Sequence, residues 1–246
     1  MTKAEKLSYL TERAQHIMYM SKDPIHEASH VARVVDHCTR MSIELSLSEI
    51  QTQALILAAW WHDASRVLTK NPSFIMMPLV DDLLSALLLW RETIRCGLFG
   101  SVAGMATRII FCKSFGAGRI LTKILMTKKN QLLIDALKDA DTLDLLHTSR
   151  MDSLLTIAEH SVWYERGYRF MVWWFLRNKQ LYMHTVFSRE HIVLAVQEFL
   201  DWFETPEVLL WHIDHFGESW VQKNRQHGDR LIEHICLLLP QDTSYL

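Results

Sequence analysis

The chain has 246 residues, of which 49% are hydrophobic and 22% charged, values that are ordinary for a globular protein with a sizeable core. Its formal net charge of -2 favours neither a nucleic-acid partner nor attraction to an anionic membrane. The four cysteines form no CxxC pair, which argues against a thiolate zinc site and against a disulfide framework. The first residues lack the apolar segment of a secretory signal, and no apolar run is long enough to span a bilayer, so we expect a cytoplasmic protein.

Helical periodicity extends along almost the whole chain, because apolar residues recur at spacings of three and four. Only 8 glycines and 5 prolines interrupt it, and no Asn-Gly or Asp-Gly hairpin signal occurs. The sequence therefore predicts an all-α fold. We expect a single helical domain over residues 1–246, with a bundle core at about 21–150 and a helical extension at about 151–246.

The segment DPIHEASHVARVVDHC, residues 23–38, predicts an amphipathic helix that begins near Pro24. Four polar side chains of this segment recur at spacings of 4, 3 and 4 and share one face of the predicted helix: His26, His30, Arg33 and His37. Valines at neighbouring positions supply the apolar contacts that such a helix needs.

A second helix is predicted at residues 49–61. Ser48 and Gln51 have the spacing of a capping box at its start. Two prolines in the stretch TKNPSFIMMP predict a loop at 69–78, after this helix.

The stretch AAWWHDASRVL, residues 58–68, places His62 beside Asp63 at the end of a strongly apolar segment. Burying such a pair costs several kcal/mol unless each side chain is paired, hydrogen-bonded or bound to metal. Two interpretations follow: an exposed helix end, where polar residues cost nothing, or a metal site whose other ligands lie elsewhere in the chain.

A carboxylate interrupts the apolar stripe of another predicted helix. The segment LLIDALKDADTLDLL, residues 132–146, sets Asp141 among leucines and alanines at helical spacing. Asp144 lies three residues further on and shares the same face. A lone carboxylate in such a place is usually a partly exposed edge residue, but here it is a third candidate metal ligand position.

Two helix starts are predicted in the last third of the chain. Thr205 followed by Pro206 combines an N-cap residue with a proline at the first helical position. Ser188 has the character of another N-cap, before a helix at 189–203.

The same third contains an aromatic run, RGYRFMVWWFLR at residues 166–177, with basic ends. Contact with lipid or a nucleobase is conceivable for this run, but so apolar a segment favours a buried helix or a subunit interface. A homodimer through these tryptophan-rich helices is therefore a candidate assembly. His212 and His215, three residues apart, are a candidate second metal site, although surface histidines are commoner.

Three of these motifs together resemble the HD superfamily of metal-dependent phosphohydrolases. They are HxxRV at 30–34, HD at 62–63 and DADTLD at 139–144. Each is weak alone, but their order and separation match the family over about 120 residues. The resemblance implies a helical HD core and a metal centre whose ligands are His30, His62, Asp63 and Asp141.

The donor set of two imidazoles and two carboxylates suits one divalent transition ion such as Mn²⁺, Fe²⁺, Co²⁺, Ni²⁺ or Zn²⁺. Members of the family with two metals add histidines between the HD pair and the last aspartate, but no histidine occurs here from 64 to 146. The sequence therefore favours a mononuclear site. HDASRVLT also resembles the HDASEVLT of bacterial 5′-deoxynucleotidases, but Arg66 stands where they have a catalytic glutamate, so their activity does not simply transfer.

Roles for the surrounding residues follow from this arrangement. Asp63 is expected to orient or deprotonate the attacking water while it binds the metal. Arg66, one predicted helical turn after His62, is the candidate clamp for phosphoryl oxygens. Arg33 is expected to pair with Asp141, Asp144 or another carboxylate, with substrate contact as the second interpretation. His26 is expected to line the pocket or support a ligand rather than bind the metal.

The leading functional hypothesis is hydrolysis of a nucleotide or another small phosphate ester by a metal-activated water. A catalytically silent HD domain used for ligand sensing or assembly is the alternative, since Arg66 replaces the glutamate. A mononuclear enzyme of non-hydrolytic chemistry is a third. The expected partner is a small phosphorylated molecule, with no nucleic acid and no membrane span.

Overall fold

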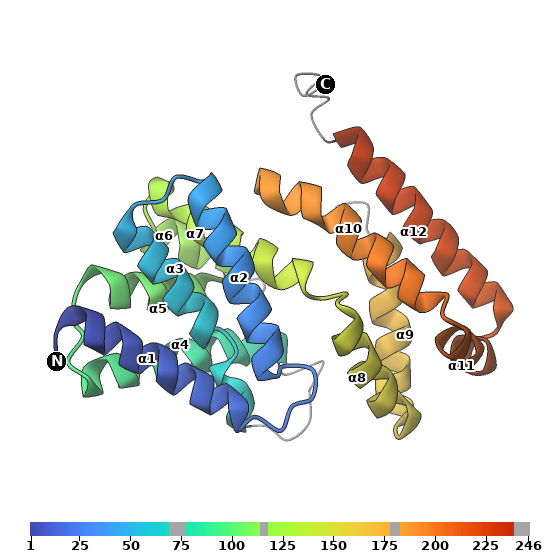
Figure 1. Cartoon of the computed structure of the whole chain (residues 1–246), viewed down its shortest axis with the longest axis horizontal. Helices are drawn as coiled ribbons and strands as arrows, with labels where there is room; N and C mark the ends of the chain where they lie inside the picture. Colours follow the sequence, from blue (N-terminus) through green and yellow to red (C-terminus); the bar gives the residue numbers. More distant parts are fainter. Residues whose placement is uncertain (69–76, 114–117, 178–182, 239–246) are drawn as a thin grey trace. The chain divides into compact units, whose positions relative to one another are not determined.

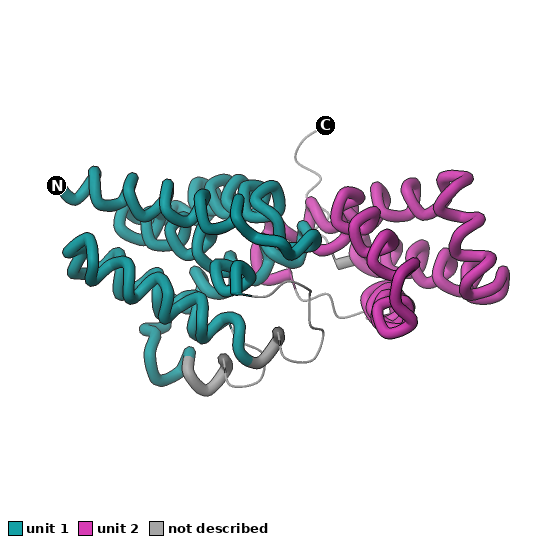
Figure 2. Tube along the Cα trace, turned by 90° about the horizontal axis from the view of Figure 1, so that it is seen from below, with its two compact units in different colours: residues 1–144 teal, residues 145–246 magenta. Residues whose placement is uncertain are grey.

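The computed structural model describes residues 1–68, 77–113, 118–177 and 183–238. Within these ranges the chain forms α-helices and one short 3₁₀ helix and contains no strand, which confirms the predicted all-α class (Figure 1). None of the described helices combines the length and apolarity that a membrane span requires. The chain divides into two compact units, residues 1–144 and 145–246 (Figure 2).

The first unit ends close to the core boundary that we expected near residue 150. Its helices, in chain order, are α1 (Lys3–Tyr19), α2 (Ala28–Glu44), α3 (Glu49–Trp61), the 3₁₀ helix η1 (Ala64–Leu68), α4 (Met77–Arg95), α5 (Ser101–Lys113), α6 (Gly118–Leu125) and α7 (Lys128–Leu143). Of the predicted loop at 69–78, residues 69–76 lie outside the described part, and residues 77 and 78 open α4.

Helix α3 is the central element of this unit and lies against α1, α2, α5 and α7. Its second half, ALILAAWW at residues 54–61, is apolar on all sides, which is typical of a helix in a protein core. Its alanines Ala54, Ala58 and Ala59 are fully buried and let the neighbouring helices approach closely. The predicted capping box is confirmed, because the Gln51 side-chain oxygen accepts a hydrogen bond from the Ser48 backbone N–H at 3.1 Å.

The core of the first unit begins earlier than residue 21, the start that the sequence suggested. Helix α1 packs against α3, and the indole N–H of the fully buried Trp61 donates to the Leu10 carbonyl at 3.0 Å. A buried indole N–H needs such a partner, so this bond fixes α1 on the end of α3.

Helix α2 begins later than the sequence suggested, at Ala28, so His26 does not share a helical face with His30 as predicted. The cause is a turn stabilised by Asp23, whose Oδ1 accepts hydrogen bonds from the backbone N–H groups of Ile25 at 3.0 Å and His26 at 3.3 Å. A short carboxylate that bonds the backbone ahead of it competes with helix formation.

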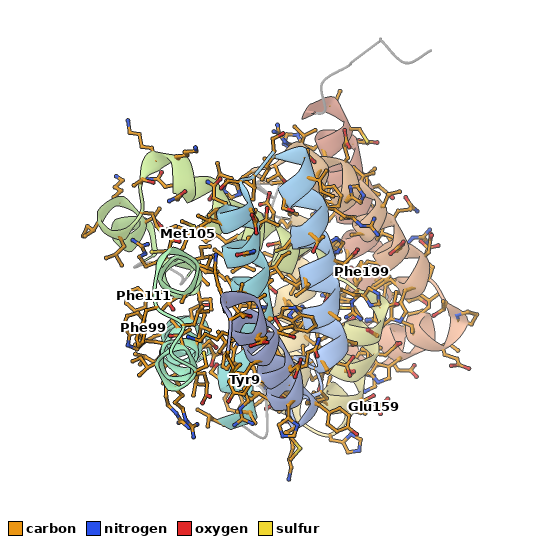
Figure 3. All side chains as sticks on the ribbon, turned by 60° about the vertical axis from the view of Figure 1, so that its left-hand side comes forward. Tyr9, Phe99, Met105, Phe111, Glu159 and Phe199 are labelled. Atoms are coloured by element: carbon orange, nitrogen blue, oxygen red, sulfur yellow. The ribbon has the colours of Figure 1, made fainter. Side chains whose placement is uncertain are left out.

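The second unit has five described helices: α8 (Thr148–Glu159), α9 (Val162–Arg177), α10 (Val186–Phe203), α11 (Pro206–Phe216) and α12 (Glu218–Leu238). Helix α12 packs against α9, α10 and α11. Gly228 permits close contact with α10, because a Cβ at this position would lie 2.7 Å from a methyl carbon of Leu200. Phe199 of α10 is fully buried, whereas Phe99 of the first unit is 76% exposed. Both side chains are labelled in Figure 3.

One of the two helix starts predicted in this unit is confirmed. Helix α11 begins at Pro206 with Thr205 as its N-cap. The other prediction was wrong: α10 begins at Val186, and its N-cap is Thr185 rather than Ser188. The Thr185 hydroxyl accepts the Ser188 backbone N–H at 3.2 Å, so the serine occupies the first turn instead of the cap.

Helix α9, which contains the aromatic run 166–177, is only partly buried. Tyr168, Val172 and Phe175 are fully buried, but Phe170 is 61% exposed and Trp174 43% exposed. The expectation of a buried helix therefore holds for one face, and a homodimer through this helix stays a prediction.

His212 lies at the centre of an aromatic cluster in the second unit and is fully buried, so the expectation of a surface histidine was wrong. Its Nδ1 donates to the Val208 carbonyl at 2.7 Å, and its Nε2 accepts from the Tyr168 hydroxyl at 2.7 Å. Its ring contacts those of Phe203 and Trp220. Both ring nitrogens are engaged within the core, so His212 has no lone pair to offer a metal.

This burial predicts a loss of stability in mild acid. Burial lowers the pKa of His212 to about 4 from an ordinary value of 6.5. Because the folded state disfavours the proton, the stabilisation is fully present above pH 6.5 and is lost as the pH falls towards 4, by about 3 kcal/mol in total. The free energy of unfolding at several pH values is measured by urea denaturation, with tryptophan fluorescence as the signal. His212→Gln keeps an acceptor for Tyr168 without titrating, and should flatten this dependence; an equal slope in both proteins would contradict it.

Candidate metal centre

Three helices of the first unit bring metal-competent side chains together. His30 lies in the first turn of α2, His62 caps the end of α3, and Asp141 lies near the end of α7. These helices pack against one another in all three pairs, so the three positions meet. Asp63 follows His62 and directly precedes η1.

His62 is oriented as a metal ligand by its own helix. Its Nδ1 donates to the Ala59 carbonyl at 2.7 Å, because a carbonyl oxygen can only accept. Burial also lowers the pKa of this fully buried imidazole, so the ring is neutral and Nε2 carries the lone pair. Among the described residues Nε2 has no hydrogen-bond partner, and it lies 3.4 Å from Asp63 Oδ2 and 3.8 Å from Asp141 Oδ1.

His30 is oriented by a carboxylate. Its Nδ1 lies 2.6 Å from Oδ2 of Asp144, an oxygen that accepts, so Nε2 is the nitrogen directed at the other ligand candidates. Arg33 holds Asp144 in turn, through its Nε and through Nη2 at 3.2 Å. The prediction that Arg33 pairs with Asp141, Asp144 or another carboxylate is thereby confirmed, with Asp144, the residue that caps the end of α7, as the partner. A carboxylate behind an imidazole is the usual support of a metal-binding histidine, because it fixes the tautomer and raises basicity.

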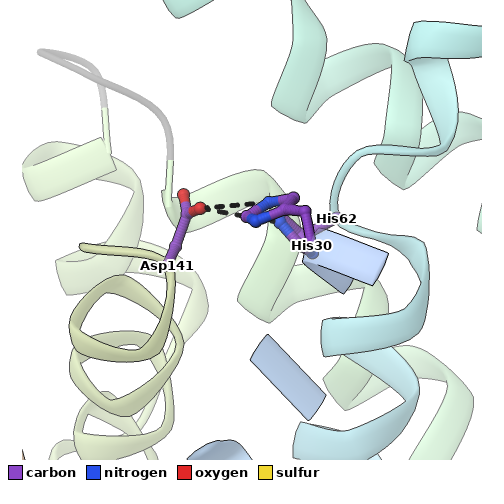
Figure 4. Close-up of side chains that lie close together, drawn as sticks. All are labelled: His30, His62 and Asp141. Carbon is purple, nitrogen blue, oxygen red and sulfur yellow. Dashed lines mark ion pairs between the residues drawn. The ribbon is translucent and has the colours of Figure 1, made fainter. Parts of the chain in front are cut away.

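The donor atoms converge at the spacing of a metal site (Figure 4). One atom from each of His30, His62 and Asp141 lies within 4.8 Å of the other two. His30 Nε2 is 3.2 Å from Asp63 Oδ2 and 3.5 Å from Asp141 Oδ1. Two ligands that each lie about 2.1 Å from a shared ion, at angles between 90° and 109°, are about 3.0 to 3.4 Å apart. The separations of 3.2 to 3.8 Å between these atoms lie at or slightly above this range, so the side chains are close to the geometry of a site for a single divalent ion.

Both carboxylates of the site are ionised at neutral pH. Burial by itself raises the pKa of Asp63, but the charges and hydrogen bonds of its neighbours, His26, His30 and Arg66 among them, outweigh it and hold the pKa well below its usual value. Burial acts on Asp141 in the same direction, and the Lys113 ammonium is the largest of the opposing influences, so this pKa is also low. Two ionised carboxylates this close to two imidazoles favour a bound cation.

Lys113, the last residue of α5, belongs to the site, although sequence reasoning did not select it. Its Nζ lies 2.8 Å from Asp141 Oδ2 and 3.7 Å from Asp82 Oδ1. A signal was present in the sequence, because Lys113 continues the helical stripe of Ile109 and Ile110, both fully buried. A lysine at a core-facing position needs a carboxylate partner.

Arg66 lies close to the site but in a different setting from the one predicted. Helix α3 ends at Trp61 and a 3₁₀ helix follows, so Arg66 is not one α-helical turn beyond His62. Its side chain is buried, with Nη2 at 2.8 Å from Asp81 Oδ2 and Nε at 4.0 Å from Asp63 Oδ1. The phosphate-clamp role of Arg66 stays a prediction.

His26 lies in the turn before α2. Its Nδ1 is 3.0 Å from Asp23 Oδ2, and its ring meets that of His30 edge-on with 5.9 Å between centroids. This position is beside the ligand cluster. Its expected role in lining the pocket stays a prediction.

Comparison of the chain with family models, with curated proteins and with solved structures finds no match. The likeness to the HD superfamily therefore depends on the three sequence motifs and stays a prediction.

The geometry predicts that a divalent ion stabilises the fold. At a free concentration about 100 times the dissociation constant, Mn²⁺ or Zn²⁺ should add about 2.7 kcal/mol and raise Tm by about 5 to 10 °C. His62→Ala removes one ligand and should abolish most of this rise in a thermal melt, while the exposed His160→Ala should keep it. An equal rise in His62→Ala and wild type would contradict the assignment of His62.

Proposed function

We propose that this chain is a metal-dependent phosphohydrolase that acts on a nucleotide or another small phosphate ester. The observation that carries the proposal is the convergence of His30 Nε2 and His62 Nε2 with two ionised carboxylates. The order of HxxRV, HD and DADTLD along the chain, which resembles the HD superfamily, supports it.

Four side chains would hold the ion in this proposal: His30, His62, Asp63 and Asp141. These ligands are two imidazole nitrogens and two carboxylate oxygens, with no thiolate. Such a set suits Mn²⁺, Fe²⁺, Co²⁺, Ni²⁺ or Zn²⁺. A divalent ion bound there supplies Lewis acidity, which lowers the pKa of water and neutralises charge that develops on a phosphoryl group.

The protein's own groups do the remaining work of a hydrolysis. A water oxygen forms a bond to phosphorus, the bond from phosphorus to the ester oxygen breaks, and the proton of the water passes to a base or to solvent. Asp63 lies 3.2 Å from His30 Nε2 and 3.4 Å from His62 Nε2, so it is placed to bind the ion and to orient the water. The ester oxygen leaves with a proton drawn from solvent.

Substrate contacts are assigned to Arg66, His26 and Arg33. The Arg66 guanidinium is planar and can bind two phosphoryl oxygens at once, provided that substrate competes with Asp81 for it. Arg33 is 25% exposed while it holds Asp144, and His26 is part-buried beside His30, so each can border a bound substrate.

A catalytically silent domain that senses a ligand is the second candidate, and the Arg66–Asp81 ion pair favours it. An arginine that is 7% exposed and bound to a buried carboxylate is engaged in the fold. In that case the metal centre would be a binding site for a phosphorylated ligand without turnover.

A phosphatase and phosphodiesterase panel with Mn²⁺, Co²⁺ or Ni²⁺ separates the two candidates. We expect wild type to release phosphate or nucleoside monophosphate from at least one nucleotide or phosphodiester. Asp63→Asn should abolish turnover, because it removes a charged ligand and the group that orients water. Wild type that binds metal but turns over nothing in the panel would support the silent domain and contradict the hydrolase.

Arg66 and Asp81 are tested as a matched pair in the same assay. Removal of either partner from the buried ion pair should cost about 3 to 5 kcal/mol of stability. Only Arg66→Ala should also reduce turnover, by about two to three orders of magnitude, because it loses a transition-state donor. Equal turnover by Arg66→Ala and Asp81→Ala would show that Arg66 is structural.

A further inference from the structure

The two oxygens of Asp141 face different cations. Oδ1 lies 3.5 Å from His30 Nε2 and 3.8 Å from His62 Nε2, on the side of the ligand cluster. Oδ2 lies 2.8 Å from the Lys113 ammonium. Asp141 therefore bridges the candidate metal position and a fixed positive charge.

The Lys113 ammonium lies in a nearly closed environment. Its side chain is 13% exposed, and the Asp82 carboxylate, 15% exposed, lies 3.7 Å away on another helix, α4. An ammonium that lies 2.8 Å from one carboxylate oxygen and 3.7 Å from another carries its charge at neutral pH. Burial raises the pKa of Asp82, which the lysine opposes.

We propose that the Lys113 ammonium occupies the position of a second cation beside the metal ion and thereby limits this centre to one ion. The proposal rests on the proposed metal centre. It assigns Lys113 as the residue that determines how many ions the site accepts, through its contacts with Asp141 Oδ2 and Asp82 Oδ1.

Charge balance supports one ion. Three carboxylates interact electrostatically with Lys113, namely Asp141, Asp82 and Asp63, and together they carry three negative charges. One divalent ion and the ammonium carry three positive charges and neutralise them. A second divalent ion beside an intact Lys113 would add two uncompensated charges to a site with little solvent, which is strongly unfavourable.

Ligand supply supports the same conclusion. Removal of the Lys113 ammonium would leave two carboxylate oxygens near its position, Asp141 Oδ2 on α7 and Asp82 Oδ1 on α4. Carboxylate oxygens and water suit Mn²⁺. Two protein ligands with water make a weak site, which fills at millimolar rather than micromolar Mn²⁺.

The experiment counts Mn²⁺ ions per chain by isothermal titration calorimetry and by electron paramagnetic resonance. We expect wild type to bind one ion up to millimolar Mn²⁺. Lys113→Ala should bind two, and the pair should give the resonance of exchange-coupled ions, because Asp141 bridges them. Lys113→Arg keeps the charge and should bind one ion.

Asp82 supplies the matched control. Lys113→Ala combined with Asp82→Asn removes a ligand of the second ion and should return the count to one. Where Lys113→Ala does not fold, by circular dichroism, Lys113→Met takes its place, since it keeps the apolar stem and has neither a charge nor a donor for Asp141.

The possible failures are distinguishable. One ion in a folded Lys113→Ala or Lys113→Met protein overturns the role of Lys113 and leaves the metal centre intact. Two ions in wild type have the same consequence. No ion in wild type overturns the metal centre itself.

Discussion

Burying two imidazoles beside two carboxylates costs several kcal/mol unless their polar atoms are compensated, and the first unit compensates them from several directions. The Ala59 carbonyl accepts a hydrogen bond from Nδ1 of His62, on the side of the ring away from the other ligand candidates. Asp144, which Arg33 holds, binds the other imidazole. Lys113 binds the outer oxygen of Asp141. These outer contacts leave the inner donor atoms directed at one another, an arrangement that a divalent ion stabilises.

The second unit shows the opposite solution for a buried imidazole. His212 satisfies both ring nitrogens within its own core, through Val208 and Tyr168, and is surrounded by aromatic rings. Its polar atoms need no ion. The same residue type therefore has a structural role in one unit and a candidate ligand role in the other, and the partners of the two ring nitrogens decide between them.

Sequence reasoning could predict the helical class and the Ser48–Gln51 cap from periodicity and spacing, and the approach of His30, His62 and Asp141 from the resemblance to the HD motifs. It placed His26 on α2 because it did not weigh the backbone hydrogen bonds of Asp23 against helix propensity. It placed Arg66 one α-helical turn after His62, because a change from α to 3₁₀ geometry leaves little trace in apolar spacing. It missed Lys113 because its partners lie far along the chain, on α4 and α7.

If the first unit binds one divalent ion through four side chains, the ion itself can be located. The most direct measurement is anomalous X-ray diffraction at the manganese edge from crystals grown with Mn²⁺. We predict a single strong peak with His30 Nε2, His62 Nε2 and one oxygen each of Asp63 and Asp141 at about 2.0 to 2.4 Å. A crystal without a peak there, in which the two imidazoles instead hydrogen-bond directly to Asp63 and Asp141, would contradict the metal centre.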